Sequence, residues 1–211
     1  MQRTRPPARR IPLSRRSHIT GFQPLKTGTA EHESTLERDF VTLTAFVYPA
    51  AVITSQPVTF AFMDGAVRRR YTPDFLVSQA SAGADELIEV KYECDLHENW
   101  ATLKPGFEAA QRWAEENHAT FRVLTDCDIR GPVLQNAKRL LPLRAAPLDT
   151  RMAMLALTQA HALQRPTFGA LLASLPDRAL ALATLWRLIA RSALHADLSV
   201  PITFDSELRP A

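Results

Sequence analysis

The chain has 211 residues, of which 46% are hydrophobic and 22% are charged. This composition supplies a packed core and excludes a globally disordered chain. No apolar stretch reaches the ~18 residues of a membrane-spanning helix, and the N-terminus lacks the apolar segment of an ordinary secretory signal. Two cysteines, Cys94 and Cys127, exclude a disulfide framework and a four-cysteine zinc site. We therefore expect a soluble, cytoplasmic protein.

The formal net charge of +3 is distributed unevenly. Residues 1–30 contain seven basic side chains and no acidic one, whereas the remainder has more acidic than basic groups. Arms of this kind often bind nucleic acid, so a polyanionic partner is expected, and a solvated leader is the alternative. Four prolines and the lack of a sustained period predict that residues 1–30 are extended or disordered. The candidate DNA contacts in this arm are Arg9, Arg10, Arg15 and Arg16.

The next segment combines a helix with hairpin strands. Apolar side chains recur every three or four positions over residues 32–46, which predicts one face of a helix. Four strand-like runs follow, over residues 52–54, 58–63, 67–77 and 86–92. Asp64-Gly65 predicts a tight turn between the second and third runs.

A second helix is predicted over residues 104–118, with Pro105 in its first turn. A short strand over residues 120–125 and a helix over residues 131–141 follow. The order of helix, antiparallel strands, helix, strand and helix is typical of a mixed α/β layer. We expect one α/β domain over residues 31–145.

Two prolines within residues 142–147 mark a domain boundary. Three helices are predicted beyond it, over residues 150–163, 167–173 and 177–193. Residues 194–202 alternate weakly and predict a small hairpin. Three helices and a hairpin in so short a segment are the outline of a winged helix-turn-helix, so we expect a winged-helix-like domain over residues 146–211.

The candidate chemistry lies where two predicted strands meet. Glu89 and Lys91 share one strand face because they are two residues apart, and antiparallel pairing can bring Asp74 beside them. Paired carboxylates suit Mg²⁺, which lowers the pKa of a bound water and stabilises charge on a phosphate. A nearby lysine can orient that water or neutralise the phosphate. The residues predict phosphodiester hydrolysis, and a surface hairpin with a Glu/Lys pair for solubility is the alternative.

This spacing is the PD…(D/E)xK motif of restriction-endonuclease-like nucleases, and two observations support it. Glu89 and Lys91 interrupt an otherwise apolar strand. The preceding predicted helix contains Glu33 and Glu37, four residues apart on one face, and so supplies an additional carboxylate.

Four blocks occur in a fixed order: Glu33-Ser34-x-Leu36-Glu37-Arg38-Asp39-Phe40, Gln56-Pro57, Arg70-Tyr71-Thr72-Pro73-Asp74-Phe75-Leu76-Val77 and Leu87-Ile88-Glu89-Val90-Lys91. Together they resemble the TnsA family, the endonuclease subunits of heteromeric bacterial transposases, over roughly residues 30–140. The resemblance implies a restriction-endonuclease-like mixed sheet flanked by helices. The C-terminal segment resembles the family's winged helix in outline.

The resemblance also implies roles by position. The catalytic residues would be Glu37, Asp74, Glu89 and Lys91, with Glu33 as the alternative to Glu37. The ligands of a catalytic Mg²⁺, for which Mn²⁺ would substitute, would be Glu37, Asp74, Glu89 and the backbone carbonyl of Val90. Many relatives have proline after the lysine, where this chain has Tyr92.

The function implied is cleavage of the transposon-end strand that an integrase-type partner does not cut, during cut-and-paste transposition. The implied partners are DNA, a TnsB-like integrase-type transposase and a TnsC-like AAA+ ATPase regulator. One alternative is a non-catalytic DNA-binding or bridging subunit of a transposition complex. Another is a free-standing repair or restriction nuclease.

Two groups of arginines are further candidates for contacts. Arg68, Arg69 and Arg70 lie in a predicted hairpin next to the motif, where they can hold a DNA backbone. Arg178, Arg187 and Arg191 lie on the last predicted helix. That helix either reads DNA, contacts a partner protein or packs within the chain, and we place protein contact first because the segment is rich in Leu and Ala.

Overall fold

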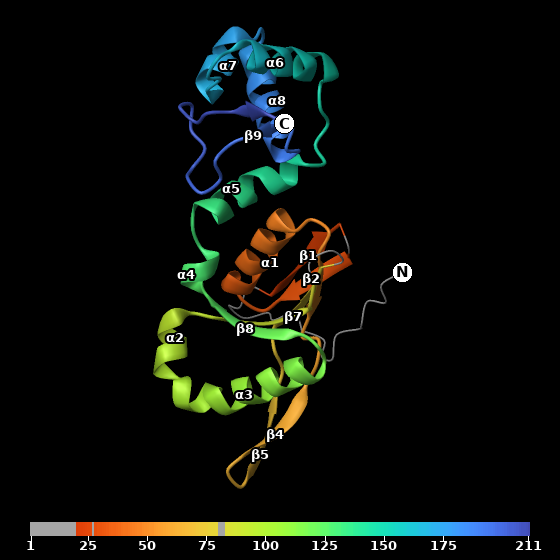
Figure 1. Cartoon of the computed structure of the whole chain (residues 1–211), viewed down its shortest axis with the longest axis vertical. Helices are drawn as coiled ribbons and strands as arrows, with labels where there is room; N and C mark the ends of the chain where they lie inside the picture. Colours follow the sequence, from red (N-terminus) through yellow and green to blue (C-terminus); the bar gives the residue numbers. More distant parts are fainter. Residues whose placement is uncertain (1–19, 27, 80–82) are drawn as a thin grey trace. The chain divides into compact units, whose positions relative to one another are not determined.

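The computed structural model describes residues 20–26, 28–79 and 83–211, and the chain divides into two compact units after Arg130 (Figure 1). Among the described residues, no helix is both long and apolar enough to cross a membrane. The expectation for residues 1–19, including the four candidate arginines of the arm, lies outside what the structure describes.

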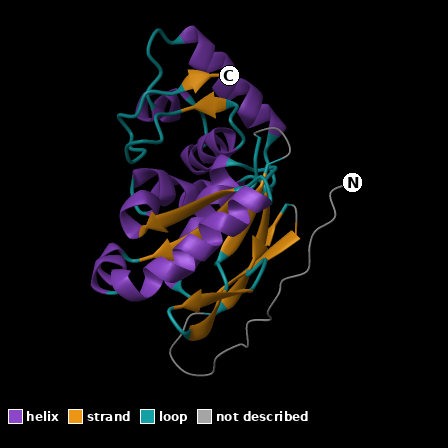
Figure 2. Cartoon of the chain, turned by 60° about the horizontal axis from the view of Figure 1, so that its bottom comes forward, coloured by secondary structure: helices purple, strands orange, loops and turns teal. Residues whose placement is uncertain are grey.

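The centre of the first unit is a four-stranded sheet in the order β3-β6-β7-β8. Its strands are β3 (Val52–Ser55), β6 (Phe75–Ser78), β7 (Glu86–Lys91) and β8 (Thr120–Thr125). The first three strands pair antiparallel, and β8 joins β7 in parallel. This mixed sheet, drawn in orange among purple helices in Figure 2, confirms the predicted α/β class.

Two helices cover opposite faces of this sheet, α1 (Thr35–Val47) and α3 (Trp100–Glu116) (Figure 1). On the α1 face, the rings of Phe40 and Phe75 lie 5.0 Å apart. On the α3 face, Leu76 and Leu87 pack with Ala110. Because side chains alternate along a strand, Asp74, Glu89 and Lys91 share the α3 face with Leu76 and Leu87.

The strand predicted over residues 67–77 is wrong as a single element, because it breaks into β5 (Val67–Tyr71) and β6. β5 pairs with β4 (Phe60–Asp64) in a separate hairpin that extends past α3 in Figure 1. The break falls at Thr72-Pro73, where proline has no N–H to donate to a ladder. Residues 56–59 separate β3 from β4, whereas the shorter segment 72–74 separates β5 from β6. The connection between β3 and β4 therefore contains one residue more than the connection between β5 and β6, as in a β-bulge.

The expected N-terminal arm ends earlier than predicted, because β1 (Gly21–Leu25) and β2 (Gly28–His32) pair as an antiparallel hairpin. Ser55 joins this hairpin to the sheet, since its hydroxyl accepts from the Glu31 N–H at 2.9 Å and donates to the Glu31 carbonyl at 2.8 Å. These are long-range contacts that the composition of the segment does not reveal.

The helix predicted over residues 104–118 also starts too late. The chain forms α2 (Glu93–Glu98) directly after β7 and continues into α3 through Asn99, so Pro105 lies inside α3 and not in its first turn. The short α4 (Asp126–Ile129) then follows β8. Asp128 caps α4 by accepting from the N–H and hydroxyl of Thr125.

The second unit begins with α5 (Pro132–Leu140) and the 3-10 turn η1 (Leu141–Leu143). Its other elements are α6 (Thr150–Ala162), α7 (Phe168–Ser174), α8 (Arg178–Ala190), β9 (Leu194–His195) and β10 (Arg209–Pro210). The three helices after residue 146 were predicted. The hairpin within residues 194–202 was not found, because β9 pairs with the distant β10. The winged-helix assignment stays a prediction.

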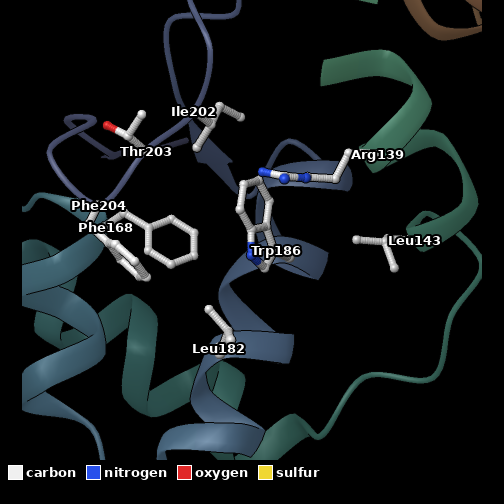
Figure 3. A pocket seen from close by; sticks show the side chains of 8 residues that line it. All are labelled: Arg139, Leu143, Phe168, Leu182, Trp186, Ile202, Thr203 and Phe204. Atoms are coloured by element: carbon white, nitrogen blue, oxygen red, sulfur yellow. The ribbon is translucent and has the colours of Figure 1, made fainter. Parts of the chain in front are cut away.

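The domain boundary at residue 145 differs from the observed division, because α5 packs in the second unit. Buried Asn136 donates from Nδ2 to the carbonyls of Leu198 and Val200, at 3.0 Å and 2.8 Å. The guanidinium of Arg139 lies 4.5 Å from the centre of the Trp186 ring. Figure 3 draws these two side chains next to each other. The periodicity of α5 predicted the helix, but its partners Trp186, Leu198 and Val200 lie 47 to 64 positions further along the chain.

Two fragments test this boundary. We expect residues 1–130 to melt cooperatively, because they contain the whole sheet and both helices that cover it. A fragment of residues 1–145 adds α5 without the segments that bury Leu134, Ala137 and Leu140. Thermal melting and size-exclusion chromatography should show the longer fragment associating through this apolar face. A monomeric 1–145 fragment more stable than 1–130 would contradict the division.

Candidate active site

The candidate site lies where the β6–β7 ladder ends. The last pair in this ladder is Phe75–Ile88, so continuing the register places Asp74 directly opposite Glu89. At that point a side chain completes the ladder, because the Asp74 Oδ2 atom accepts from the Val90 N–H at 2.8 Å. The sequence prediction that antiparallel pairing brings Asp74 beside Glu89 therefore agrees with the observed register.

Glu89 is buried, with 3% of its surface exposed, and both of its carboxylate oxygens have partners. The Lys91 ammonium lies 2.7 Å from Oε1. The Tyr71 hydroxyl donates to Oε2 at 2.6 Å. This arrangement fixes the carboxylate, since an ion pair and a charge-assisted hydrogen bond hold its two oxygens separately.

Tyr71 is itself positioned by α3. Its ring lies against Phe107, at 6.0 Å between ring centres, and against Phe60 of β4, at 5.6 Å. A Cβ atom at Gly106 would lie only 3.2 Å from the Tyr71 ring. The absence of a side chain at Gly106 therefore allows α3 to approach the residue that donates to Glu89.

Glu37 approaches the site from the N-terminus of α1. Ser34 caps this helix by accepting from the Glu37 N–H at 3.1 Å, and the Glu37 carboxylate accepts from the Glu33 N–H at 2.7 Å. Glu33 thus precedes the helix, so the prediction that both acids lie on one helical face is wrong. Ser34 is the reason, because its cap starts the helix three positions after the predicted first residue.

The ionisable groups affect one another electrostatically. Burial and the nearby Glu89 carboxylate raise the pKa of Asp74 well above its usual value, and Glu37 adds to this effect. Burial also raises the pKa of Glu37, although Lys91 opposes the shift. Burial disfavours the charge on Lys91, but Glu89, Asp74 and Glu37 together outweigh it and raise the pKa of the ammonium. Three acids therefore surround one cationic side chain.

The donor set fits a hard divalent cation better than a softer metal. Among the described residues, no group of three or more His, Cys, Asp and Glu side chains is arranged to hold a metal ion. Mg²⁺ does not require such a cage, because it is usually bound by one or two carboxylates and keeps several waters. Glu89 is buried and Asp74 is half-buried with a desolvated carboxyl group, so the pair has an excess of negative charge that a bound cation would offset.

Tyr92, where the resemblance leads us to expect proline, has a structural role at the end of β7. Its hydroxyl accepts from Arg130 at 3.2 Å and lies 3.3 Å from the Thr35 hydroxyl of α1. Arg130 also pairs with Asp39 of α1, at 3.3 Å. The exit of β7 is thereby attached to the helix that presents Glu37.

Residues 51–126 match the family model described as TnsA-like endonuclease N terminal. These residues form a TnsA-like nuclease domain. The match includes Asp74, Glu89 and Lys91, and it ends before the second unit. No curated protein matches the chain.

The site residues that the resemblance implies do not all lie within this TnsA-like domain. Asp74, Glu89, Val90 and Lys91 lie together within the matched segment, whereas Glu37 lies outside it on α1. Glu37 is one of the main contributors to the raised pKa values of both Asp74 and Lys91.

The residue that sequence reasoning missed is Tyr71. It was quoted within the motif block but given no role. A signal was present, since a tyrosine directly before Thr-Pro-Asp lies at the end of a hairpin arm, with an apolar ring suited to a helix and a hydroxyl suited to a nearby carboxylate. The contact itself depends on the register between two separate strands.

The raised pKa of Asp74 predicts how stability depends on pH. The unfolded chain loses this proton near the usual value of 3.8, whereas the folded chain keeps it to higher pH. Above 3.8 the folded state therefore binds more protons, so the contribution of Asp74 to stability falls as pH rises. In EDTA at neutral pH, we expect Asp74→Asn to melt higher than the wild type, because asparagine still accepts from Val90 N–H without a buried charge.

The matched measurement at pH 4 should give a smaller difference, because the wild-type carboxyl is then protonated in the folded state. For a chain of this size, 1 kcal/mol corresponds to about 2–4 °C in melting temperature. Equal or lower stability of Asp74→Asn at both pH values would contradict the electrostatic account.

Proposed function

We propose that this protein is a Mg²⁺-dependent DNA endonuclease subunit of a multi-subunit transposase. The observation that supports this most directly is the cluster of Asp74, Glu89 and Lys91 at the end of the β6–β7 ladder, inside the TnsA-like domain. A hydrolytic site for phosphodiesters needs oxygen ligands for a metal ion and, beside them, a positively charged side chain. This cluster provides both.

Each residue has a distinct proposed role. Asp74 and Glu89 would hold the Mg²⁺, with the Val90 carbonyl and Glu37 as the other candidate ligands. Bound Mg²⁺ supplies an activated water and offsets negative charge on the phosphate. Lys91 places a positive charge where the scissile phosphate enters, and Tyr71 keeps Glu89 in one orientation by donating to it.

The proposed place in transposition follows from the resemblance to the TnsA family. The protein would cut the strand at each transposon end that a TnsB-like integrase-type transposase leaves intact. A TnsC-like AAA+ ATPase would regulate the assembly. Cutting both strands releases the element, so this subunit would distinguish cut-and-paste transposition from copying.

The β4–β5 hairpin is the proposed surface for flanking DNA, and its two faces differ. On one face Arg69 pairs with Asp64 at 2.8 Å. On the other face, exposed Arg68 and Arg70 have no partner among the residues that the structure describes. They are two positions apart on a strand, about 6.8 Å, which matches about two nucleotides of rise in one DNA strand. We therefore assign phosphate contacts to Arg68 and Arg70 rather than to all three arginines.

The salt dependence of DNA binding tests this assignment. Each phosphate contact removed should make the slope of log K against log salt shallower by about 0.9. Arg68→Ala and Arg70→Ala should each show this loss, and Arg69→Ala is the matched control that should not. An effect of Arg69→Ala equal to the others would show that the hairpin acts only through its net charge.

For the second unit we propose contact with a partner protein, through a surface formed by α6, α7 and α8. DNA reading by α8 is disfavoured because Arg191 donates to the carbonyls of Arg144 and Ala146. An apolar cavity of about 560 Å³ opens beside α8, and Figure 3 shows Trp186 and Phe204 lining it. Such a lining suits apolar side chains better than phosphates.

The catalytic assignment is tested by Asp74→Ala and Lys91→Ala. The first removes the Asp74 carboxylate from the proposed cation site, and the second removes the positive charge that would face the phosphate. We expect both proteins to fold and both to lose Mg²⁺-dependent strand cleavage by orders of magnitude. Lys104→Ala is a matched control, since its ammonium pairs with Glu108 on the exposed surface of α3.

A plasmid transposition assay extends this test to the complete system. With Asp74→Ala, the uncut strand stays attached to the donor, so fused donor–target molecules should replace simple insertions. Simple insertions at the wild-type proportion would disprove the catalytic role. If no product forms at all, a pull-down with the partner subunits separates failed assembly from failed chemistry.

A further inference from the structure

Gln56 is a buried polar residue that the proposed mechanism does not use. Only 7% of its surface is exposed, and its Oε1 atom is a buried acceptor without a hydrogen-bond partner in the described part of the chain. Buried polar atoms in folded proteins are almost always hydrogen-bonded, so each exception needs an explanation. A site that binds a ligand is one such explanation.

The backbone at Gln56 is also unusual. Its φ angle is +45°, in the left-handed region that glycine and asparagine enter more readily. The residue lies in the segment that contains the extra position between β3 and β4, directly before Pro57. A bulge of this kind redirects side chains, and such bulges are over-represented next to active sites.

The register places Gln56 beside the candidate site. The β3–β6 pairing ends at Ser55–Phe75, and the Gln56 N–H continues it by donating to the Asp74 carbonyl at 2.7 Å. Asp74 in turn lies opposite Glu89 on β7. Gln56, Asp74 and Glu89 therefore form one row across three neighbouring strands.

The chemistry of the unpartnered atom limits what can bind there. An amide oxygen accepts hydrogen bonds or coordinates a cation. The non-bridging oxygens of a DNA phosphate are acceptors as well, so they cannot satisfy it. A water molecule held by a hydrated divalent cation is a donor of the required kind, and Mg²⁺ keeps several such waters.

We propose that Gln56 is a positioning residue for the hydrated cation of this site, its Oε1 atom accepting a hydrogen bond from a cation-bound water. The inference rests on the proposed metal-dependent function. It adds a neutral acceptor from β3 to the acids of β6 and β7. Removing an outer contact of this kind typically lowers metal affinity or activity by about 10- to 100-fold.

Gln56→Met tests the proposal in the full-length protein, because methionine keeps the length of the side chain and removes the amide. In EDTA we expect a melting temperature equal to or above the wild type, since the change deletes an unsatisfied buried acceptor. In a titration with MnCl₂ or MgCl₂, the dissociation constant obtained from the thermal shift should rise about 10-fold or more. Gln111→Met, on the exposed surface of α3, is the matched control and should leave both quantities unchanged.

Gln56→Gly provides a second variant that suits the left-handed backbone and also lacks the amide. If either folded variant binds Mn²⁺ and Mg²⁺ as the wild type does, the proposal is overturned. A lower melting temperature of both variants in EDTA, with unchanged metal affinity, would also overturn it in favour of a purely structural role. If the wild type itself shows no metal-dependent shift, the proposed function fails together with the inference. If the wild type shows a metal-dependent rise in melting temperature and Gln56→Met shows the same rise, the inference about Gln56 fails while the proposed function stands.

Discussion

The central constraint on the first unit is a pair of acidic residues opposite each other at the end of one β-ladder, with Glu89 buried and Asp74 half-buried. Asp74 and Glu89 repel one another in an environment where water screens them poorly, which is why the pKa of Asp74 is raised. The surrounding contacts offset this cost. Val90 donates its N–H to Asp74, and Lys91 and Tyr71 occupy the two oxygens of Glu89.

These compensating contacts come from two different parts of the fold. β7 supplies Val90 and Lys91 through its own alternation, whereas Tyr71 reaches Glu89 from the β4–β5 hairpin. The hairpin can do so because the long arm bends at Thr72-Pro73 and at the extra residue near Gln56. The same bend therefore separates the arginine-bearing hairpin from the sheet and delivers its last residue to the site. Gly106 completes this arrangement by letting α3 pack against the Tyr71 ring.

The sequence was sufficient for those features that depend on local pattern. Alternation placed Glu89 and Lys91 on one face, the Pro-Asp and Glu-x-Lys spacing identified the acids, and helical periodicity found α1 and α5. It was insufficient where a contact joins distant positions. Ser55 attaches the β1–β2 hairpin through Glu31, Asn136 attaches α5 to the loop around residue 200, and neither partner leaves a periodic signal. The predicted start of α1 is wrong for a local reason, because Ser34 caps the helix and leaves Glu33 outside it.

Lys91 links the electrostatics of the site to its proposed chemistry. In this structure its ammonium neutralises Glu89, and with about a third of its side chain exposed it can also reach an incoming group. A divalent cation at Asp74 and Glu89 would take over the neutralisation of both acids, because its charge is larger and its oxygen ligands are already in place. The ammonium would then be free to face a phosphate. Asp74 and Glu89 repel each other in the free site, and the same two acids would be stabilised most by a bound cation. The electrostatic cost of the fold and the affinity for its proposed cofactor would thus arise from the same pair of residues.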